Sequence, residues 1–521
     1  MKESDASNKF SYKRFHYSHP IFGTLKKNET PNFTHHEDDY NAFNNEGLIP
    51  HMLTTQGPPL AKGDVNADGL EDIFIGGGKD QSALLFIQTE LGEWKVQSAT
   101  SFLADLPCED SAAEFFDADG DSDLDLLVAS GGQNTQTNPE YLNPRLYRND
   151  GKGNFQKDVG FLPKLFLNAS CIKPNDFDKD GDVDVFIGAS VIPFLYGMSP
   201  SSYLLTNDGK GNFSVAQDWL GQSRFDNPTQ VNPGMVKDAV WTDINADNKP
   251  DLILVGEWMP ITILIQNERH QFENRTEKVG MTQTNGWWNS IAAADFDRDG
   301  DEDYVVGNLG LNSRLKATPE KPVKMYLGDF DSNGSSDHIL VYFNGDKSYP
   351  FASRDQLVKQ LPGLKKKFLK YKDYRDVILE SIITPQQKGN SAEMHVDVFA
   401  SSYFRNDKGK LVRADLPAEA QLAPVFAICV EDVDKDGNLD IVLGGNLMAT
   451  QPDFGPYDAS LGLVLLGDGK GNWQSLDPMQ SGLVIPGETR HIQRITNFKN
   501  EKIVLVSRNN HSVVGFKILQ K

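Results

Sequence analysis

Short runs of apolar residues, rich in valine, isoleucine, leucine and phenylalanine, recur along the chain. Clear examples lie at residues 73–75, 183–187, 252–255 and 439–443. Runs of this length, bounded by polar and glycine-containing stretches, are typical of β-strands rather than of helices. Each of these runs lies at the end of an acidic stretch, so the pattern predicts strands that are joined by acidic loops.

The acidic stretches share one nine-residue pattern. It has Asp at position 1, Asp or Asn at position 3, Asp at position 5, usually Gly at position 6, and Asp at position 9. The seven copies begin at Asp64, Asp117, Asp176, Asp243, Asp295, Asp329 and Asp432. The sixth copy has Asn333 at position 5, and two copies have Ser122 and Asn248 at position 6. Asn tolerates the left-handed conformation that Gly provides, so Ser122 is the least suited of these residues.

Side chains at positions 1, 3 and 5 can converge on one point only if the chain curls around it, and Gly at position 6 permits that turn. The carbonyl at position 7 and Asp at position 9 would complete the ligand set. Six to eight oxygen ligands suit a hard cation such as calcium. An EF-hand would need flanking helices, whereas these flanks predict strands. The alternative is an Asp-rich turn that binds no metal, although crowded carboxylates without a cation repel one another.

The predicted ligands of up to seven Ca²⁺ ions fall into seven sets, one for each loop. They are Asp64, Asn66, Asp68, Leu70 and Asp72; Asp117, Asp119, Asp121, Asp123 and Asp125; Asp176, Asp178, Asp180, Asp182 and Asp184; Asp243, Asn245, Asp247, Lys249 and Asp251; Asp295, Asp297, Asp299, Asp301 and Asp303; Asp329, Asp331, Asn333, Ser335 and Asp337; and Asp432, Asp434, Asp436, Asn438 and Asp440. The residue at position 7 is included in each set for its backbone carbonyl.

A second repeated element is an Asp-Gly turn followed by an aromatic residue, at residues 149–155, 207–213 and 467–473. Asp-Gly between two strand patterns indicates a hairpin. The repeating unit is therefore strand, acidic loop, strand, longer loop, strand, hairpin, strand. Four antiparallel strands in roughly 50–60 residues are typical of a propeller blade. The sequence predicts an all-β fold, a seven-bladed β-propeller with calcium loops between the first two strands of the blades.

The loop at Asp329 has no hairpin of its own, which indicates an insertion in the fifth blade. If this loop instead belongs to a full blade, the propeller has eight. We expect an amino-terminal extension at 1–30, a propeller at 31–521 closed by a strand near Phe33, and a helical insertion at 346–397. Within the insertion, a capping box at Ser353 predicts a helix at 357–361, and apolar spacing predicts a second at 364–383.

The acidic loop between strands resembles the FG-GAP or VCBS repeat of integrin-α-like β-propellers. Four further stretches, GPPLAKGD at 57–64, GEWMP at 256–260, GWWNS at 286–290 and GNLGLNS at 307–313, are similar to bacterial surface proteins, especially of Bacteroidota. Those proteins are related to the cartilage-acidic-protein and ASPIC/UnbV group. The resemblance covers nearly all of 31–521, without the carboxy-terminal ASPIC/UnbV segment. It implies an exported calcium-binding propeller and leaves open a longer polypeptide.

The chain carries a formal net charge of −22, with 51 Lys and Arg against 73 Asp and Glu. This charge argues against nucleic acid or an anionic membrane as the main partner. Calcium in all seven loops would neutralise more than half of it. Cys108, Cys171 and Cys429 are too few for a disulfide framework and are predicted to be buried. No apolar run reaches the roughly 20 residues of a transmembrane helix.

Calcium loops of this kind bind with Kd values of about 10⁻⁴–10⁻³ M in extracellular modules. Such sites would fill outside a cell and stay largely empty in the cytosol. We therefore expect an extracytoplasmic protein, at the cell surface or secreted, although the amino terminus shows no apolar signal segment.

The face opposite the calcium loops is the predicted binding face for a glycan or a protein. Its candidate residues are Trp258, Trp287, Trp288, Asn308, Asn312 and Arg314. The alternative is that Trp287 and Trp288 pack between blades. The predicted function is a non-catalytic binding or adhesion module, and the alternative is a calcium-dependent lyase or hydrolase of acidic polysaccharides. No catalytic residue is nominated, because the spacing of the histidines is not diagnostic.

Overall fold

The computed structural model describes residues 20–97, 100–132, 138–221 and 231–519. Across them the chain folds into eight antiparallel sheets, each built on a path of four hydrogen-bonded strands. The fold is therefore all-β, as the short apolar runs predicted. The described residues contain no helix long and apolar enough to cross a membrane. Cys108, Cys171 and Cys429 are buried and free, also as predicted.

Seven of the sheets follow one another along the sequence. In hydrogen-bonded order their strands are β2 (Leu60–Gly63), β3 (Asp72–Ile75), β4 (Leu84–Gln88) and β5 (Trp94–Val96); β6 (Asp110–Phe116), β7 (Asp125–Ser130), β8 (Arg145–Arg148) and β9 (Gln156–Lys157); β10 (Asn168–Asn175), β11 (Asp184–Val191), β12 (Tyr203–Thr206) and β13 (Ser214–Val215); β14 (Met235–Thr242), β15 (Asp251–Met259), β16 (Thr262–Gln266) and β17 (Phe272–Asn274); β19 (Ser290–Ala294), β20 (Asp303–Gly307), β25 (Ser402–Asp407) and β26 (Lys410–Asp415); β27 (Val425–Glu431), β28 (Asp440–Gly445), β29 (Leu463–Gly467) and β30 (Trp473–Leu476); and β31 (Glu488–Thr496), β32 (Lys502–Asn509), β33 (Val514–Ile518) and β1 (Phe22–Thr24). The short strand β18 (Gly286–Trp287) also pairs with β15.

The first strands of these seven sheets contact one another in cyclic order. Strand β2 contacts β6, and the contacts continue through β10, β14, β19 and β27 to β31, which returns to β2. The sheets thus stand around a common axis, as the blades of a β-propeller do. Buried apolar clusters fill the space between neighbouring sheets. The fold is β-propeller-like.

The amino-terminal strand lies earlier in the chain than we predicted. Strand β1 pairs with β33, with Phe22 opposite Ile518, and so falls within residues 1–30, which we expected to precede the propeller. Phe22 packs edge-on against Phe516 in the core of the last sheet. The predicted Phe33 is buried instead between the first and last sheets, where it forms no strand.

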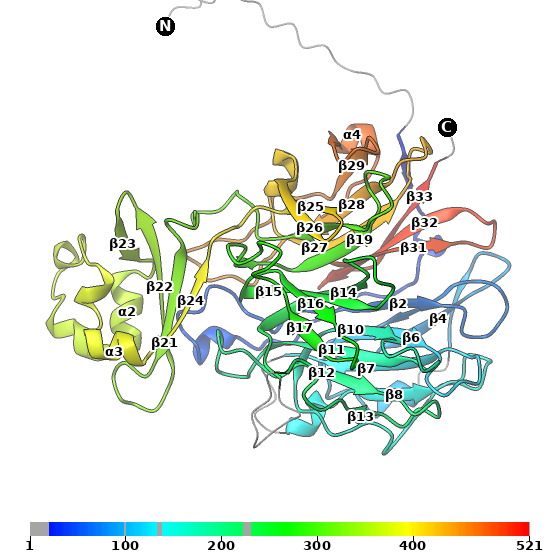
Figure 1. Ribbon diagram of the computed structural model, residues 1–521, viewed down its shortest axis with the longest axis horizontal. Coiled ribbons are helices and arrows are strands. Elements are labelled where there is room, and N and C mark those ends of the chain that lie inside the picture. Colours follow the sequence, from blue (N-terminus) through cyan, green and yellow to red (C-terminus); the bar gives the residue numbers. More distant parts are fainter. Residues whose placement is uncertain (1–19, 98–99, 133–137, 222–230, 520–521) are drawn as a thin grey trace, which may run out of the picture.

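The eighth sheet is inserted between β20 and β25. Its strands, in hydrogen-bonded order, are β23 (Lys347–Pro350), β22 (Asp337–Asn344), β21 (Val323–Gly328) and β24 (Ala392–Val396). The Asp329 loop joins β21 to β22, so it lies within an insertion in the fifth sheet. The inserted sheet projects from one end of the molecule (Figure 1).

One of the two predicted helices is present. Helix α2 (Arg354–Gln360) begins at Ser353, whose side chain accepts a hydrogen bond from the Gln356 backbone, as the capping box predicted. The predicted helix at 364–383 is wrong, because this segment forms separate 3-10 turns. The Asp373 carboxylate accepts a hydrogen bond from the Lys370 backbone at 2.9 Å and so starts a new turn there.

The remaining short helical segments lie in connections between strands. They are η2 (Lys27–Glu29), η3 (Ala42–Asn44), α1 (Thr100–Leu103), η5 (Pro139–Leu142), η6 (Pro362–Lys366), η7 (Tyr371–Asp373), η8 (Leu379–Ser381), α3 (Pro385–Asn390), η9 (Ala418–Gln421) and α4 (Pro478–Ser481).

A buried polar network joins the inserted sheet to the rest of the molecule. The Tyr196 hydroxyl donates to Glu257 at 2.7 Å, and its backbone amide donates to Glu46 at 2.9 Å. His338 of β22 lies with its Nε2 2.9 Å from the Tyr196 carbonyl oxygen, while its Nδ1 is buried without a partner among the described residues. Burial lowers the pKa of His338 to about 4, against a smaller opposing effect of this hydrogen bond.

Acid should therefore weaken this junction. A histidine whose pKa is lowered on folding contributes stability that is complete above its unfolded pKa of about 6.5 and is lost as the pH falls toward 4. We expect His338→Gln to reduce the pH dependence of the unfolding free energy by about 1 kcal/mol per pH unit between pH 6 and 5. Urea unfolding at these two pH values measures it. The matched variant His270→Gln, at an exposed histidine, should keep the wild-type dependence, and equal slopes for all three proteins would contradict the assignment.

Candidate functional site

The acidic loops share one backbone conformation. Position 6 has a positive φ in all seven, with values from 63° at Asn248 to 101° at Gly181. Position 4 is also left-handed, for example at Lys179 with φ 61°. Ser122 adopts φ 75° at position 6, the strained conformation that its residue type predicted. Six loops join the first strand of a sheet to the second, and the Asp329 loop joins two strands of the inserted sheet.

Aspartate at position 9 anchors each loop to its sheet. Asp440 is buried, and its two carboxylate oxygens accept hydrogen bonds from the backbone amides of Gly467 at 2.9 Å and Val433 at 2.8 Å. Asp72 is bonded in the same way. Burial is the main cause that raises the pKa of position 9, with the backbone hydrogen bonds opposing it. The pKa is about 7 at Asp72, Asp184, Asp251 and Asp440, and about 6 at Asp303 and Asp337.

Five loops bring three carboxylates together, with ligand atoms within 4.8 Å of one another. The groups are Asp117, Asp119 and Asp121; Asp176, Asp178 and Asp184; Asp295, Asp297 and Asp299; Asp329, Asp331 and Asp337; and Asp432, Asp434 and Asp440. In each loop the backbone amide at position 7 donates to the side chain at position 5, as Asp182 does to Asp180 at 3.2 Å. These clusters could bind metal ions.

Four of the five clusters contain a buried carboxylate oxygen without a hydrogen-bond partner among the described residues. These atoms include the Oδ1 atoms of Asp119, Asp176, Asp295 and Asp432. A buried anionic oxygen without a partner is costly, and a cation is the partner that several such oxygens can share. The residues of these four loops, which begin at 117, 176, 295 and 432, therefore fit calcium.

The other three loops are satisfied internally. Asp64 accepts hydrogen bonds from the backbone amides of Asp68 at 3.1 Å and Gly69 at 2.8 Å, and the Asn66 amide donates to Asp68 at 3.0 Å. The Asp243 loop repeats this pattern. In the Asp329 loop, both oxygens of Asp329 also accept backbone amides. An asparagine at position 3 or 5 marks these three loops in the sequence.

The prediction of an exposed binding face is wrong for four of its six residues, and for Trp287 and Trp288 the alternative that they pack inside the fold is confirmed. Trp258, Trp287, Trp288 and Asn308 are buried, with exposed fractions of 7%, 2%, 0% and 0%. Trp258 and Trp287 pack into a cluster with residues of the amino-terminal segment and the inserted sheet, which cover this end of the molecule. The Asn308 side chain donates to the Val398 carbonyl oxygen at 3.0 Å. The burial of this face by the amino-terminal segment and the inserted sheet could not be predicted from the sequence, because those segments follow no repeat pattern.

Asn312 and Arg314 are exposed, as predicted for a binding face. The Asn312 amide donates to the Leu422 carbonyl oxygen at 3.1 Å. The Arg314 guanidinium lies 4.9 Å from the centre of the Phe351 ring and donates to the Asp453 carbonyl oxygen at 2.7 Å. Arg314 thereby lines an open groove of about 550 Å³ on the inserted sheet.

The geometry defines a repeat protein with a β-propeller-like fold and acidic loops that could bind metal ions. Its repeats are FG-GAP-like: three stretches match that repeat, at residues 64–128, 117–187 and 243–306, and each spans two acidic loops. No curated protein matches the sequence.

Remote similarity to solved structures extends along most of the chain. The crystal structure of BBS1N in complex with ARL6DN, soaked with lead, has a TM-score of 0.43 and 10% identity, covering 93% of this chain and 97% of that one. The same complex soaked with mercury has a TM-score of 0.42 and 9% identity, covering 94% and 98%. The V. cholerae biofilm matrix protein Bap1 has a TM-score of 0.36 and 9% identity, covering 94% and 91%.

Proposed function

We propose that this protein is a calcium-stabilised, seven-bladed β-propeller that acts outside the cytoplasm as a non-catalytic binding module. The observation that carries the proposal is the buried carboxylate oxygen without a partner in each of four loops that gather three aspartates. Positions 1, 3 and 5, the carbonyl at position 7 and, where it joins the cluster, position 9 would hold the ion. Calcium there would fix the turn between the first two strands of a blade.

The seven-bladed, closed ring is supported by two observations. The first strands of seven sheets contact one another in cyclic order, whereas the inserted sheet lies outside that order. Strand β1 occupies the outer edge of the last sheet beside β33. A strand contributed from the other end of the chain ties such a ring shut and covers an edge that would otherwise be open.

The chemistry of the loops supports the proposal of an extracytoplasmic location. Oxygen-only sites in extracellular modules have Kd values of about 10⁻⁴–10⁻³ M, so they fill at the calcium concentrations found outside cells. The acidic groups of the four loops would repel one another without an ion. We therefore propose that the protein works at a cell surface or as a secreted protein.

The groove on the inserted sheet is the proposed ligand site. Tyr342, Tyr349, Phe351 and Tyr374 line it beside Arg314. Aromatic rings with adjacent hydrogen-bonding groups suit the apolar faces and hydroxyls of a glycan. The ligand of this groove could also be a protein, because tyrosine and arginine are common anchor residues of protein interfaces.

A glycan array read both for binding and for turnover tests this function. We expect binding without product formation, and Tyr349→Ala should weaken it at least tenfold because it removes a ring from the groove. The matched variant Tyr371→Ala alters an exposed tyrosine outside the groove and should bind as the wild type does. Release of unsaturated uronate products, seen by their ultraviolet absorbance, would contradict the non-catalytic proposal.

A further inference from the structure

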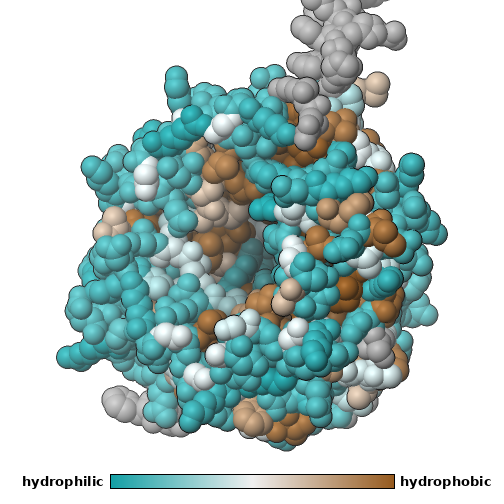
Figure 2. Space-filling model, turned by 90° about the vertical axis from the view of Figure 1, so that its right-hand side faces the viewer, coloured by the Kyte–Doolittle hydropathy of each residue, from teal (hydrophilic) through white to brown (hydrophobic). Residues whose placement is uncertain are grey.

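A cavity of about 230 Å³ lies on the axis of the sheets. Six first strands enclose it, β6, β10, β14, β19, β27 and β31, and residues 51–53, 55 and 56 of the amino-terminal segment also line it. The face that points away from the inserted sheet is hollowed at its centre (Figure 2). The cavity is separate from the groove on the inserted sheet and from the acidic loops.

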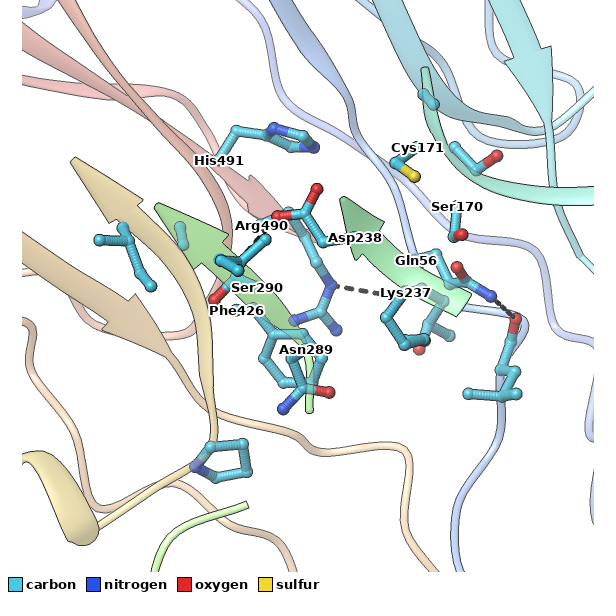
Figure 3. Close-up of a pocket in the computed structure, with 18 of the residues that line it drawn as sticks. Gln56, Ser170, Cys171, Lys237, Asp238, Asn289, Ser290, Phe426, Arg490 and His491 are labelled. Atoms are coloured by element: carbon cyan, nitrogen blue, oxygen red, sulfur yellow. Dashed lines mark hydrogen bonds between the residues drawn. The ribbon is translucent and has the colours of Figure 1, made fainter. Parts of the chain in front are cut away.

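Five of the enclosing strands carry a β-bulge at corresponding positions. The register shifts occur at Ser111, Ser170, Lys237, Phe426 and Arg490. At each bulge two consecutive residues line the cavity, such as Lys237 with Asp238 and Arg490 with His491 (Figure 3). Bulges commonly re-aim side chains next to functional sites. Repeated strands therefore present a ring of side chains that differ chemically from sheet to sheet.

Lys237 is the least satisfied member of this ring. Its side chain is only 7% exposed, and its Nζ makes no hydrogen bond to the described residues. The nearest carboxylate oxygen belongs to Glu257 and lies 3.8 Å away. That oxygen is already 3.0 Å from His51 Nε2, and the other accepts the Tyr196 hydroxyl. A buried ammonium group needs an acceptor to offset its lost hydration, so Lys237 is placed to meet an anion.

Two further donors in the lining lack acceptors. The Trp287 Nε1 is buried without a partner among the described residues. The half-buried Asn289 amide, which also lines the cavity, makes no side-chain hydrogen bond to them. By contrast, the donors of Arg490 are directed to Glu488 and to backbone carbonyl oxygens, and its guanidinium stacks on the Phe426 ring at 4.6 Å. A ligand here would have to bring oxygen acceptors.

Acidic side chains elsewhere in the cavity lining could form hydrogen bonds with hydroxyl groups of a ligand. Asp238 pairs with Lys173 at 2.8 Å, and Glu114 lies close enough to interact with both. Burial raises the pKa of Glu114 to about 7. A carboxyl group that titrates there can accept a hydrogen bond from a hydroxyl or donate one to it. The aromatic wall of Phe426 and Trp287 adds apolar contact.

We propose that the axial cavity binds a small hydroxycarboxylate of about monosaccharide size, with its carboxylate on Lys237 Nζ and its hydroxyls on the neighbouring polar groups. The cavity is smaller than the roughly 300–1,000 Å³ of pockets that hold drug-sized ligands, so it takes a single small molecule and not a polymer. Asn289 and Trp287 donate to the oxygens of the ligand, and its apolar side faces Phe426.

Isothermal titration calorimetry of the full chain in calcium tests this site with four probes: D-glucuronate, D-gluconate, D-glucose and acetate. We expect D-glucuronate to bind, and D-glucose, which has the hydroxyls without the carboxylate, to bind at least tenfold more weakly. Acetate, which has the carboxylate alone, should also bind at least tenfold more weakly. Equal binding of glucose and glucuronate, or no binding of glucuronate and of its open-chain analogue gluconate, would overturn the proposal.

Variants then assign the binding to the cavity. Lys237→Met keeps the length of the side chain and should reduce glucuronate affinity at least tenfold, while the matched Lys324→Met on the inserted sheet should not change it. If Lys237→Met fails to fold by its thermal melt, Asn289→Ala replaces it, with an expected loss of threefold or more. Wild-type affinity in a folded Lys237→Met or Asn289→Ala protein rejects the site. Tyr349→Ala should keep glucuronate binding, which separates this site from the groove.

Discussion

Removal of calcium should lower the unfolding temperature of the protein by about 5 °C relative to 1 mM calcium. A ligand that binds only the folded state stabilises it by RT ln(1 + [L]/Kd), which is about 1.4 kcal/mol per site at 1 mM for a Kd of about 10⁻⁴ M. Four loops together give about 6 kcal/mol. With an unfolding entropy of about 2 cal/mol/K per residue, a chain of 521 residues shifts by about 1 °C per kcal/mol.

The identification of four calcium-binding loops also predicts how many ions bind and which variants lose one. We expect about four calcium ions per chain by native mass spectrometry, because four loops have buried carboxylate oxygens without partners. Asp176→Asn should remove one ion and about a quarter of the calcium-dependent shift. Asp64→Asn alters the same position of a loop whose oxygens are hydrogen-bonded internally, and it should leave both quantities unchanged. A shift of less than 2 °C with EGTA, or loss of an ion in Asp64→Asn, would contradict the assignment.

Truncation of one side chain in strand β1 should have the largest effect of any single change to the apolar core where β1 pairs with β33. Phe22 is 1% exposed and packs against Phe516 between the last sheet and its neighbour. Phe22→Ala removes a fully buried ring, which typically costs about 3–5 kcal/mol. We expect a loss of that size in the urea unfolding free energy, with a raised tendency to associate through the loosened edge of β33.

Thr24→Ala provides the control for the β1 measurement. Thr24 lies in the same strand, opposite Phe516, but its side chain is exposed. Its replacement should change stability by no more than about 0.5 kcal/mol. A loss below about 1 kcal/mol in Phe22→Ala would mean that β1 contributes little to holding the first and last parts of the chain together.

Much of the fold could be predicted because its signals are local and repeated. The acidic pattern and the short apolar runs place the first two strands of each sheet, and Ser353 marks the start of α2. The strand at Phe22 was missed because a three-residue strand lacks any periodicity, and its register is set by a partner at the far end of the chain. The helix predicted at 364–383 failed because local caps such as Asp373 compete with a continuous helix.

For the candidate sites, too, features set by neighbouring residues could be predicted from the sequence, and features set by distant segments could not. Asparagines at 66, 245 and 333 mark the loops whose carboxylates are hydrogen-bonded within the loop. At position 3 the amide of Asn66 or Asn245 donates a hydrogen bond, which a carboxylate cannot do. At position 5 the neutral Asn333 adds no charge to its loop. That signal was readable from the sequence. The ring of bulges was not, because it depends on which strands the fold brings around the axis. The segments that cover Trp287 could not be predicted either, because they come from distant parts of the chain.

The pairing of β1 with β33 constrains how the protein is made. Its two strands are separated by almost the whole chain, and Phe22 meets Ile518 only after the last sheet has emerged from the ribosome. At about 5–20 residues per second, β1 waits for roughly half a minute or longer without its partner. Throughout that interval Phe22, which the finished fold buries, has no partner strand to pack against. Because synthesis runs from the amino terminus, the last sheet is completed late. Until then, unfinished copies of the chain are most prone to aggregate with one another.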